Sequence, residues 1–165
     1  MTEDLGQIVR QAADRPDVRA AVGDLYGRVQ AEIDARRPAC AVSGRCCRFE
    51  KYGHRLFVTT MELAAFVHDL EQARAAGRAR QVAEWDGTGC PFQVARLCGV
   101  HALRPFGCRM FFCDATSTEW QNETYERFHA RLKGLHEELD VPYYYVEWLH
   151  ALRMAGALEG RDVPT

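Results

Sequence analysis

Apolar side chains recur every three or four residues through the N-terminal part of the chain, which is the spacing of one helix face. A first stretch covers residues 4–14, and a second begins at Pro16, a residue suited to the first helical turn. The apolar positions are Leu5, Ile8, Val9, Ala12, Val18, Val22, Leu25, Val29 and Ile33. The pattern predicts two amphipathic helices, the second ending near Arg36, because the residue before Pro38 avoids helical backbone angles.

The middle of the chain has a different pattern. Residues 48–52 and 55–59 have the composition of two short strands joined by a Gly-His turn. Thr59 followed by Glu62 is a capping-box pattern, which opens a helix. The predicted buried stripe of this helix is Leu63, Phe66, Val67 and Leu70.

Glycine ends this helical pattern. Gly77 is expected to break or bend the helix, and a second helical piece is expected to reach about Trp85. Residues 86–89, which read Asp-Gly-Thr-Gly, are typical of a turn and lead directly into Cys90.

Two more helices are predicted in the C-terminal part. The first covers residues 119–139, and the second restarts at residues 140–142 and ends near Gly156. Their inward positions are expected to be Tyr125, Phe128, Leu132, Leu135, Leu139, Tyr145, Trp148, Leu149 and Leu152. Of the three consecutive tyrosines at 143–145, two are expected in the core and one at the surface.

Composition narrows the class of protein. The chain has 165 residues and a formal net charge of −2 with both signs interspersed, so no basic face indicates a nucleic-acid partner. Charged residues occupy the N-terminus where a secretion signal would need apolar ones. No apolar run approaches the roughly 20 residues of a membrane helix. These features predict a soluble, cytoplasmic protein with neither a nucleic-acid nor a membrane partner.

Seven cysteines are confined to two segments, and they are the candidate metal ligands: Cys40, Cys46, Cys47, Cys90, Cys98, Cys108 and Cys113. In a reducing compartment, clustered cysteines are more often metal ligands than structural disulfides. An odd number also excludes complete internal pairing. Thiolate sulfur favours zinc, copper(I) or iron–sulfur centres. The pattern therefore predicts a thiolate centre for a metal of this kind, with iron–sulfur as one form.

The spacing of the cysteines does not determine how many metal ions one chain would hold. There is no pair of Cys-x-x-Cys motifs as in zinc fingers, and neither ferredoxin-type spacing is present. Adjacent side chains at Cys46 and Cys47 diverge, so they suit two metal positions or two corners of a cluster, with a vicinal disulfide as the rival interpretation. Seven sulfurs fit one closed site plus three ligands, or two metals sharing a thiolate. His101 is a further candidate ligand.

Arginine and aromatic side chains accompany the second cysteine segment. Arg104 and Arg109 are expected to offset thiolate charge and donate to sulfur rather than to act in catalysis. The phenylalanines in the same segment are expected to screen the site from water; they are Phe106, Phe111 and Phe112.

The ordered motifs resemble the YkgJ-type cysteine-cluster family. They are Cys40-x-x-Ser43-x-x-Cys46-Cys47, Thr59-x-x-Glu62, Cys90-Pro-Phe, and Cys98-x-Val-His-x-x-Arg104-Pro105-x-x-Cys108-Arg109-x-Phe111. The resemblance covers residues 40–113 and implies chelation of zinc or iron. The family's CxxCxxCC motif has cysteine where this chain has Ser43, and the family often has an aromatic residue at His101. Because a hydroxyl is a poor ligand for soft metals, Cys40 is expected to matter less than the other six cysteines.

These observations predict a mainly α protein, a single helical domain over residues 1–165, with a small irregular β element that carries the clustered cysteines. Residues 40–113 form the expected cysteine-cluster core, with helices at 4–36 and 119–157 on either side. Three functions stay open: a metal-binding protein, an iron–sulfur protein serving as an enzyme or accessory, and a thiol redox protein. A related cysteine cluster in flagellin lysine methylases raises the second as an alternative. No catalytic constellation is recognised, and there is no fingerprint for a methyl-donor cofactor.

Overall fold

A computed structural model describes residues 4–39, 45–48, 55–78, 85 and 87–158. Over these residues the protein is mainly helical, with two small antiparallel sheets of two strands each. None of the helices in this part of the chain has the length and apolar character needed to cross a bilayer. The helical content confirms the mainly α class predicted from periodicity.

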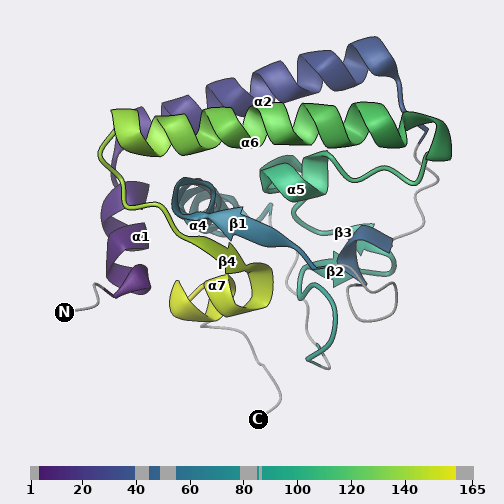
Figure 1. Ribbon diagram of the computed structural model, residues 1–165. Helices are drawn as coiled ribbons and strands as arrows, with labels where there is room; N and C mark the ends of the chain where they lie inside the picture. The colour runs from purple at the N-terminus through teal and green to yellow at the C-terminus, as the bar shows by residue number, and fades with distance from the viewer. Residues whose placement is uncertain (1–3, 40–44, 49–54, 79–84, 86, 159–165) are drawn as a thin grey trace.

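Two long helices lie side by side along one face of the molecule (Figure 1). They are α2 (Pro16–Arg36) and α6 (Thr118–Glu138), and they run in opposite directions. Both match the predicted ranges closely. A short helix, α1 (Leu5–Ala13), precedes them and begins at Asp4, whose side chain accepts a hydrogen bond from the Gly6 N–H. Each helix buries the apolar stripe that its sequence predicts.

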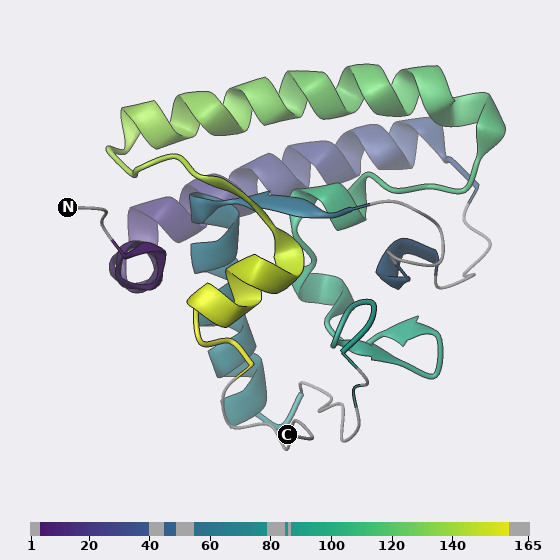
Figure 2. The same cartoon turned by 60° about the horizontal axis from the view of Figure 1, so that its bottom comes forward.

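Helix α4 (Thr60–Ala75) crosses beneath this pair (Figure 2). It opens with the predicted capping box, in which Thr59 and Glu62 exchange side-chain and backbone hydrogen bonds. Its first two turns are buried on all sides, because α1, α2, strand β1 and the side chain of Trp148 pack against the helix. Just after the helix, Gly77 adopts a positive φ of 68°. The second helical piece predicted to reach Trp85 falls largely outside the described residues.

The strand predicted at 55–59 is confirmed only for β1 (Phe57–Thr59), and its observed partner is distant in sequence. β1 pairs antiparallel with β4 (Tyr145–Glu147), with Val58 opposite Val146. The other predicted strand, 48–52, lies mostly outside the described residues. The prediction of helix from residues 140–142 onward is wrong up to Glu147, because this segment pairs with β1 and only then continues as α7 (Trp148–Met154).

The presence of a strand at 145–147, instead of a helix, changes which of the three tyrosines at 143–145 are buried. Tyr145 was predicted to face inward, but it lies in β4 with 41% of its surface exposed, and Tyr144 is equally exposed. Only Tyr143 is half-buried. In a strand, alternate side chains face opposite sides, so the helical spacing that placed Tyr145 inward does not apply. Trp148 and Leu152, which follow in α7, are buried as predicted.

The second cysteine segment folds into short elements beside the helices. These are β2 (Gln93–Val94), β3 (Leu97–Cys98), the 3-10 turn η2 (His101–Leu103), α5 (Phe106–Arg109) and the 3-10 turn η3 (Ala115–Ser117). From the first segment, the structure describes the 3-10 turn η1 (Arg45–Cys47). β2 and β3 form a hairpin whose turn residues, Ala95 and Arg96, both have positive φ. Such a turn usually contains Asn or Gly, so the sequence did not indicate it.

Aromatic packing joins this cysteine-bearing part to the helical core. Phe92 is fully buried, and its ring lies 5.4 Å from that of Phe66 on α4. Phe66 in turn packs edge-on against Trp148 of α7, with ring centroids 4.8 Å apart. Edge-to-face contacts of this kind stabilise by about 0.5–1.5 kcal/mol each beyond their buried area. The hairpin is therefore held on the same core as the helices.

His136 connects α6 to the first turn of α4. Its ring is 2% exposed, Nε2 accepts the Met61 N–H at 3.2 Å, and Nδ1 lies 2.9 Å from the Leu132 carbonyl oxygen. Because Nε2 accepts, the proton belongs on Nδ1 and the ring is neutral. Burial lowers the pKa of His136 below its ordinary value.

We expect stability to fall as the pH drops below about 6.5, the ordinary histidine pKa. Below this pH His136 binds a proton in the unfolded chain but not in the folded one. The free energy of unfolding is therefore unaffected above this pH and falls below it by at most about 1.4 kcal/mol per pH unit. Guanidinium unfolding at pH 8 and pH 5 measures the change. His136→Gln keeps a donor and an acceptor but cannot be protonated, so its pH dependence should be smaller. His150→Gln, on the exposed face of α7, should behave like the unmodified protein; an equal slope in all three would contradict this role.

Candidate metal centre

The two cysteine segments meet through the backbone. The Cys90 N–H donates to the Cys47 carbonyl oxygen at 2.7 Å. Gly89 allows this approach, since it has a φ of 65° and a Cβ atom there would lie 2.7 Å from that same oxygen. Any larger residue would be strained and would push the segments apart. The predicted turn before Cys90 therefore has a definite function: it seats one cysteine segment against the other.

The thiol of Cys47 lies at the centre of the group. It is buried, and the thiols of Cys46, Cys90 and Cys98 lie close enough to raise its pKa. Cys46 is its neighbour in η1, Cys90 precedes the hairpin, and Cys98 is in β3. The backbone bond between Cys90 and Cys47 shows that the two segments meet, whereas the ligand-sharing distance between their sulfurs stays a prediction.

Several N–H groups point at the sulfurs. The Phe92 N–H donates to Cys90 and the Val100 N–H donates to Cys98, so in both cases the donor is two residues after the cysteine. The buried indole Nε1 of Trp148 has no partner of regular hydrogen-bond geometry among the described residues. It nevertheless lies close enough to the Cys90 sulfur to lower the pKa of that thiol. Donors of this kind stabilise sulfur as thiolate.

Arginine charge reaches the same sulfurs. Hydrogen bonding with Cys47 is the main cause that lowers the pKa of Cys46 to about 6 and that of Cys98 to about 7, and the positive charge of Arg104 contributes to both. The expected charge-offsetting role is thus seen for Arg104. Arg109 interacts by charge with Cys108, and its guanidinium also donates to the carbonyls of Arg104 and Ala102 and lies 4.1 Å from the centre of the Tyr26 ring.

The protons of the four contacting thiols are shared. The pKa of Cys47 is raised because its thiol hydrogen bonds with its three neighbours, whereas the same contacts lower the pKa of Cys46, Cys90 and Cys98. The first proton therefore leaves easily and the last is held strongly, as expected for coupled sites. A fully deprotonated group of this size needs a cation to balance its charge.

Cys46 is expected to react with an alkylating agent faster than Cys108 when the protein is metal-free. Its thiol is half-exposed with a pKa of about 6, whereas burial raises the pKa of Cys108 well above the ordinary value. At pH 6.5 iodoacetamide should modify Cys46 faster than Cys108 by on the order of tenfold, after allowing for the weaker nucleophilicity of acidic thiolates. Mass spectrometry of tryptic peptides over time measures both rates, and equal rates would contradict the assignment.

Glu62 positions the turn that carries Cys108. The carboxylate is 2% exposed, Oε2 accepts the Thr59 N–H at 2.8 Å, and Oε1 accepts the Phe106 N–H at 2.7 Å. Burial raises the pKa of Glu62. The sequence indicated only the local half of this arrangement, the capping box, because the second bond joins residues that are 44 positions apart.

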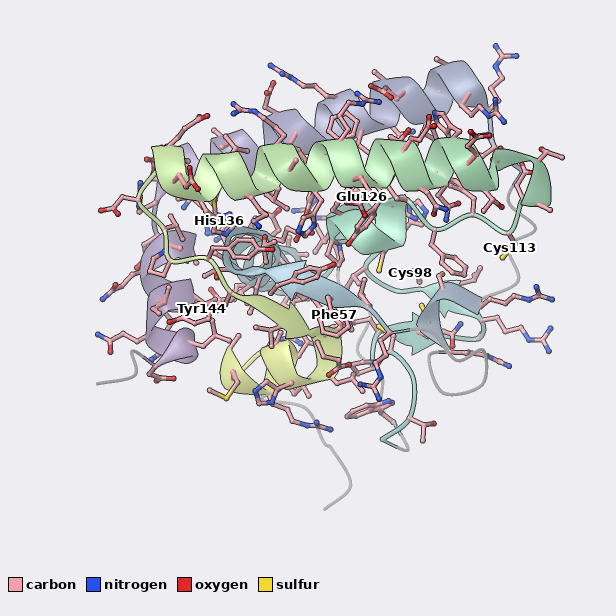
Figure 3. The ribbon with its side chains drawn as sticks, in the orientation of Figure 1. Phe57, Cys98, Cys113, Glu126, His136 and Tyr144 are labelled. Carbon is pink, nitrogen blue, oxygen red and sulfur yellow. The ribbon has the colours of Figure 1, made fainter. Side chains whose placement is uncertain are left out.

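The remaining predicted site residues are placed less centrally. Cys108 is half-buried in α5, where its thiol is within electrostatic range of Cys46, Cys90 and Cys98. Cys113 is exposed and lies away from Cys98, towards the N-terminal end of α6 (Figure 3). His101 in η2 is also exposed. Cys40 and Ser43 lie outside the described residues.

A second connection between the segments runs beside Cys113. The Ala39 N–H donates to the Asp114 carboxylate at 3.0 Å, and Arg36 donates to the Thr116 carbonyl at 2.9 Å. Hydrogen bonds with Thr116, Ala39 and Ser117 hold the pKa of Asp114 well below its usual range. The end of α2 is thereby tied to the start of α6.

Within the described part of the chain, no group of three or more His, Cys, Asp or Glu side chains is arranged so that it could hold a metal ion as it stands. The thiols around Cys47 are close to one another, but they do not surround a ready-made metal position. The screening expected of the phenylalanines is seen for Phe106, which is buried, while Phe111 and Phe112 are half-buried.

Comparison of the chain with protein-family models, with curated proteins and with solved structures gives no match in any of the three. The family resemblance in the cysteine motifs stays a prediction, and the site must be interpreted from its own chemistry. Sequence reasoning missed one contributor, Trp148, which was expected only as a core residue. No local signal could have indicated it, because Trp148 reaches Cys90 across 58 positions (148 minus 90).

Proposed function

We propose that this protein binds zinc or iron through cysteine thiolates, with Cys47 at the centre and Cys46, Cys90 and Cys98 around it. The observation that carries the proposal is the contact of the Cys47 thiol with three other cysteines drawn from both segments. Cys108 is near enough to serve as a further ligand. Soft sulfur donors in such number favour zinc, copper(I) or iron–sulfur centres over hard cations.

The surroundings of the sulfurs support thiolate ligands. Two backbone N–H groups, the Trp148 indole and the Arg104 charge all favour the deprotonated form. Donors to coordinating sulfur orient the ligands and tune the metal. A metal cation would replace the protons of these thiols, so metal binding should release protons. The resemblance of residues 40–113 to the YkgJ-type family agrees with this function.

Purification without oxygen, followed by elemental analysis and assay of acid-labile sulfide, tests the proposal. Colourless protein with zinc and no sulfide identifies a zinc centre. Brown protein with iron and sulfide that bleaches in air identifies an iron–sulfur cluster and favours an enzyme or accessory role. Protein that holds neither zinc nor iron at near-stoichiometric levels, and takes up neither after reduction, would overturn it.

A thiol redox function is the second candidate. It is favoured by the Cys46 thiol, which has a pKa of about 6 and contacts a neighbouring thiol. A low pKa makes a thiolate available for exchange. Metal-free protein that forms one reversible disulfide at Cys46, with a defined reduction potential, would support this function. Blocking of that disulfide by bound zinc would instead agree with the metal centre.

A further inference from the structure

A cavity of about 210 Å³ lies beside the cysteine group. Cys46 and Cys108 form part of its wall, so it adjoins the candidate metal centre without being enclosed by it. It is smaller than the roughly 300–1,000 Å³ of pockets for drug-sized molecules. Its size therefore suits a small ligand, such as one ring with a single polar group.

One wall is apolar and aromatic. It consists of Leu56 and Phe57, at the start of β1, together with Met110 and Phe111, which follow α5. The Phe57 ring lies 5.3 Å from that of Tyr145, so the two strands of the sheet present neighbouring aromatic faces here. In Figure 3 Phe57 is seen below the middle of α6. A wall of this kind binds a flat apolar body.

Other lining residues carry hydrogen-bond donors. Gln121, Asn122 and Tyr125 come from one side of α6. The Gln121 Oε1 accepts the Phe112 N–H at 3.1 Å, so the NH₂ group is the part of this amide left for a ligand. Tyr125 and Tyr145 share a hydrogen bond between their hydroxyls. Two hydroxyls sharing one bond keep one O–H free to donate, and both tyrosines line the cavity.

Arg55 supplies the positive charge at this cavity. Among the described lining residues it is the one with a cationic side chain, and that side chain is exposed; the Cys46 thiolate adds a negative charge where no metal neutralises it. Glu126 acts on Tyr125 by its charge, but it does not line the cavity. A guanidinium and several N–H and O–H donors are the groups that recognise a carboxylate.

We propose that this cavity is a binding site for a small aromatic carboxylate, whose ring lies on the apolar wall and whose carboxylate pairs with Arg55. The proposal goes beyond metal binding and does not depend on it, because the contacts it uses are made by Arg55, Phe57, Tyr145 and the α6 amides. A bound ligand would also cover the Cys46 and Cys108 side of the centre.

Titration of ¹⁵N-labelled protein with benzoate, benzylamine and acetate tests this directly. Benzoate should shift the amide signals of Phe57, Gly107, Asn122 and Tyr145. Benzylamine, which has a similar shape but the opposite charge, should bind at least about tenfold more weakly, since it loses the charge-assisted bond. Acetate should also bind more weakly, because it lacks the ring. Equal binding of benzoate and benzylamine, or shifts confined to other parts of the protein, would overturn the proposal.

Matched variants identify the residues involved. Arg55→Gln should weaken benzoate binding by about fivefold or more, whereas Arg153→Gln, on α7 and outside the cavity, should not change it. Tyr145→Phe should weaken it by about twofold or more, and Tyr144→Phe should not. Binding that is unaffected by both Arg55→Gln and Tyr145→Phe would overturn the assignment.

Repeating the titration after treatment with a chelator separates this site from the metal centre. Benzoate binding that persists without metal supports the cavity site, whatever the metal analysis shows. Binding that occurs only with metal present would mean that the carboxylate coordinates the metal, and would overturn the role given to Arg55.

Discussion

Replacing Cys47 with serine is expected to remove nearly all bound metal. The Cys47 thiol contacts Cys46, Cys90 and Cys98, so its loss affects every pair in the group at once. A serine hydroxyl is a poor ligand for zinc or iron in a thiolate site, and we expect metal affinity to fall by at least about a hundredfold. Metal per chain after dialysis against a competing chelator measures the effect. The melting temperature should fall as well, because bound metal stabilises the folded state.

Cys113→Ser is the matched control. Cys113 is exposed and lies apart from Cys98 (Figure 3), so this variant should keep more metal than Cys47→Ser. This expected difference in metal loss departs from the sequence prediction, which placed Cys113 among the six most important cysteines. If Cys113→Ser lost as much metal as Cys47→Ser, the centre would extend towards α6 and the central role of Cys47 would be wrong. Cys40→Ser, at a position the structure does not describe, tests the separate expectation of a lesser ligand.

The second large effect is expected at Glu62. Replacing it with alanine leaves the Thr59 and Phe106 N–H groups buried without an acceptor, which should destabilise the fold by about 2–5 kcal/mol. Glu62→Gln should cost about 1–3 kcal/mol, because an amide has only one oxygen and its NH₂ group would face one of the two donors. Guanidinium unfolding gives both values. Glu126→Gln, exposed on α6, should change stability by no more than about 0.5 kcal/mol.

A local measurement separates positioning of α5 from a general loss of stability. Glu62 holds the first amide of the turn that carries Cys108, so hydrogen exchange of the Phe106 and Arg109 amides should speed up more than exchange in α2. Equal acceleration in both places would show that Glu62 supports only the fold as a whole. A Glu62→Gln protein as stable as the original would show that the buried carboxylate is not needed.

The sequence alone determined the helices and the location of the candidate chemistry. The ranges of α1, α2, α4 and α6 follow from apolar spacing and from local end signals such as Pro16 and the Thr59–Glu62 capping box. These signals act within one or two turns, so they can be recognised without knowing the rest of the fold. The confinement of all seven cysteines to two segments was equally plain, and it predicted that the segments meet.

Only the tertiary structure decided how distant residues combine. Residues 145–147 became strand β4 because β1 offered them a partner, and this pairing overrode a helical pattern. The Trp148 indole came near Cys90, Glu62 bonded to the Phe106 N–H, and Gly89 brought Cys90 onto Cys47; no local sequence pattern indicates any of these three contacts. The ranking of Cys47 over Cys113 has the same origin. Spacing along a chain shows which cysteines are available, whereas packing decides which sulfurs touch.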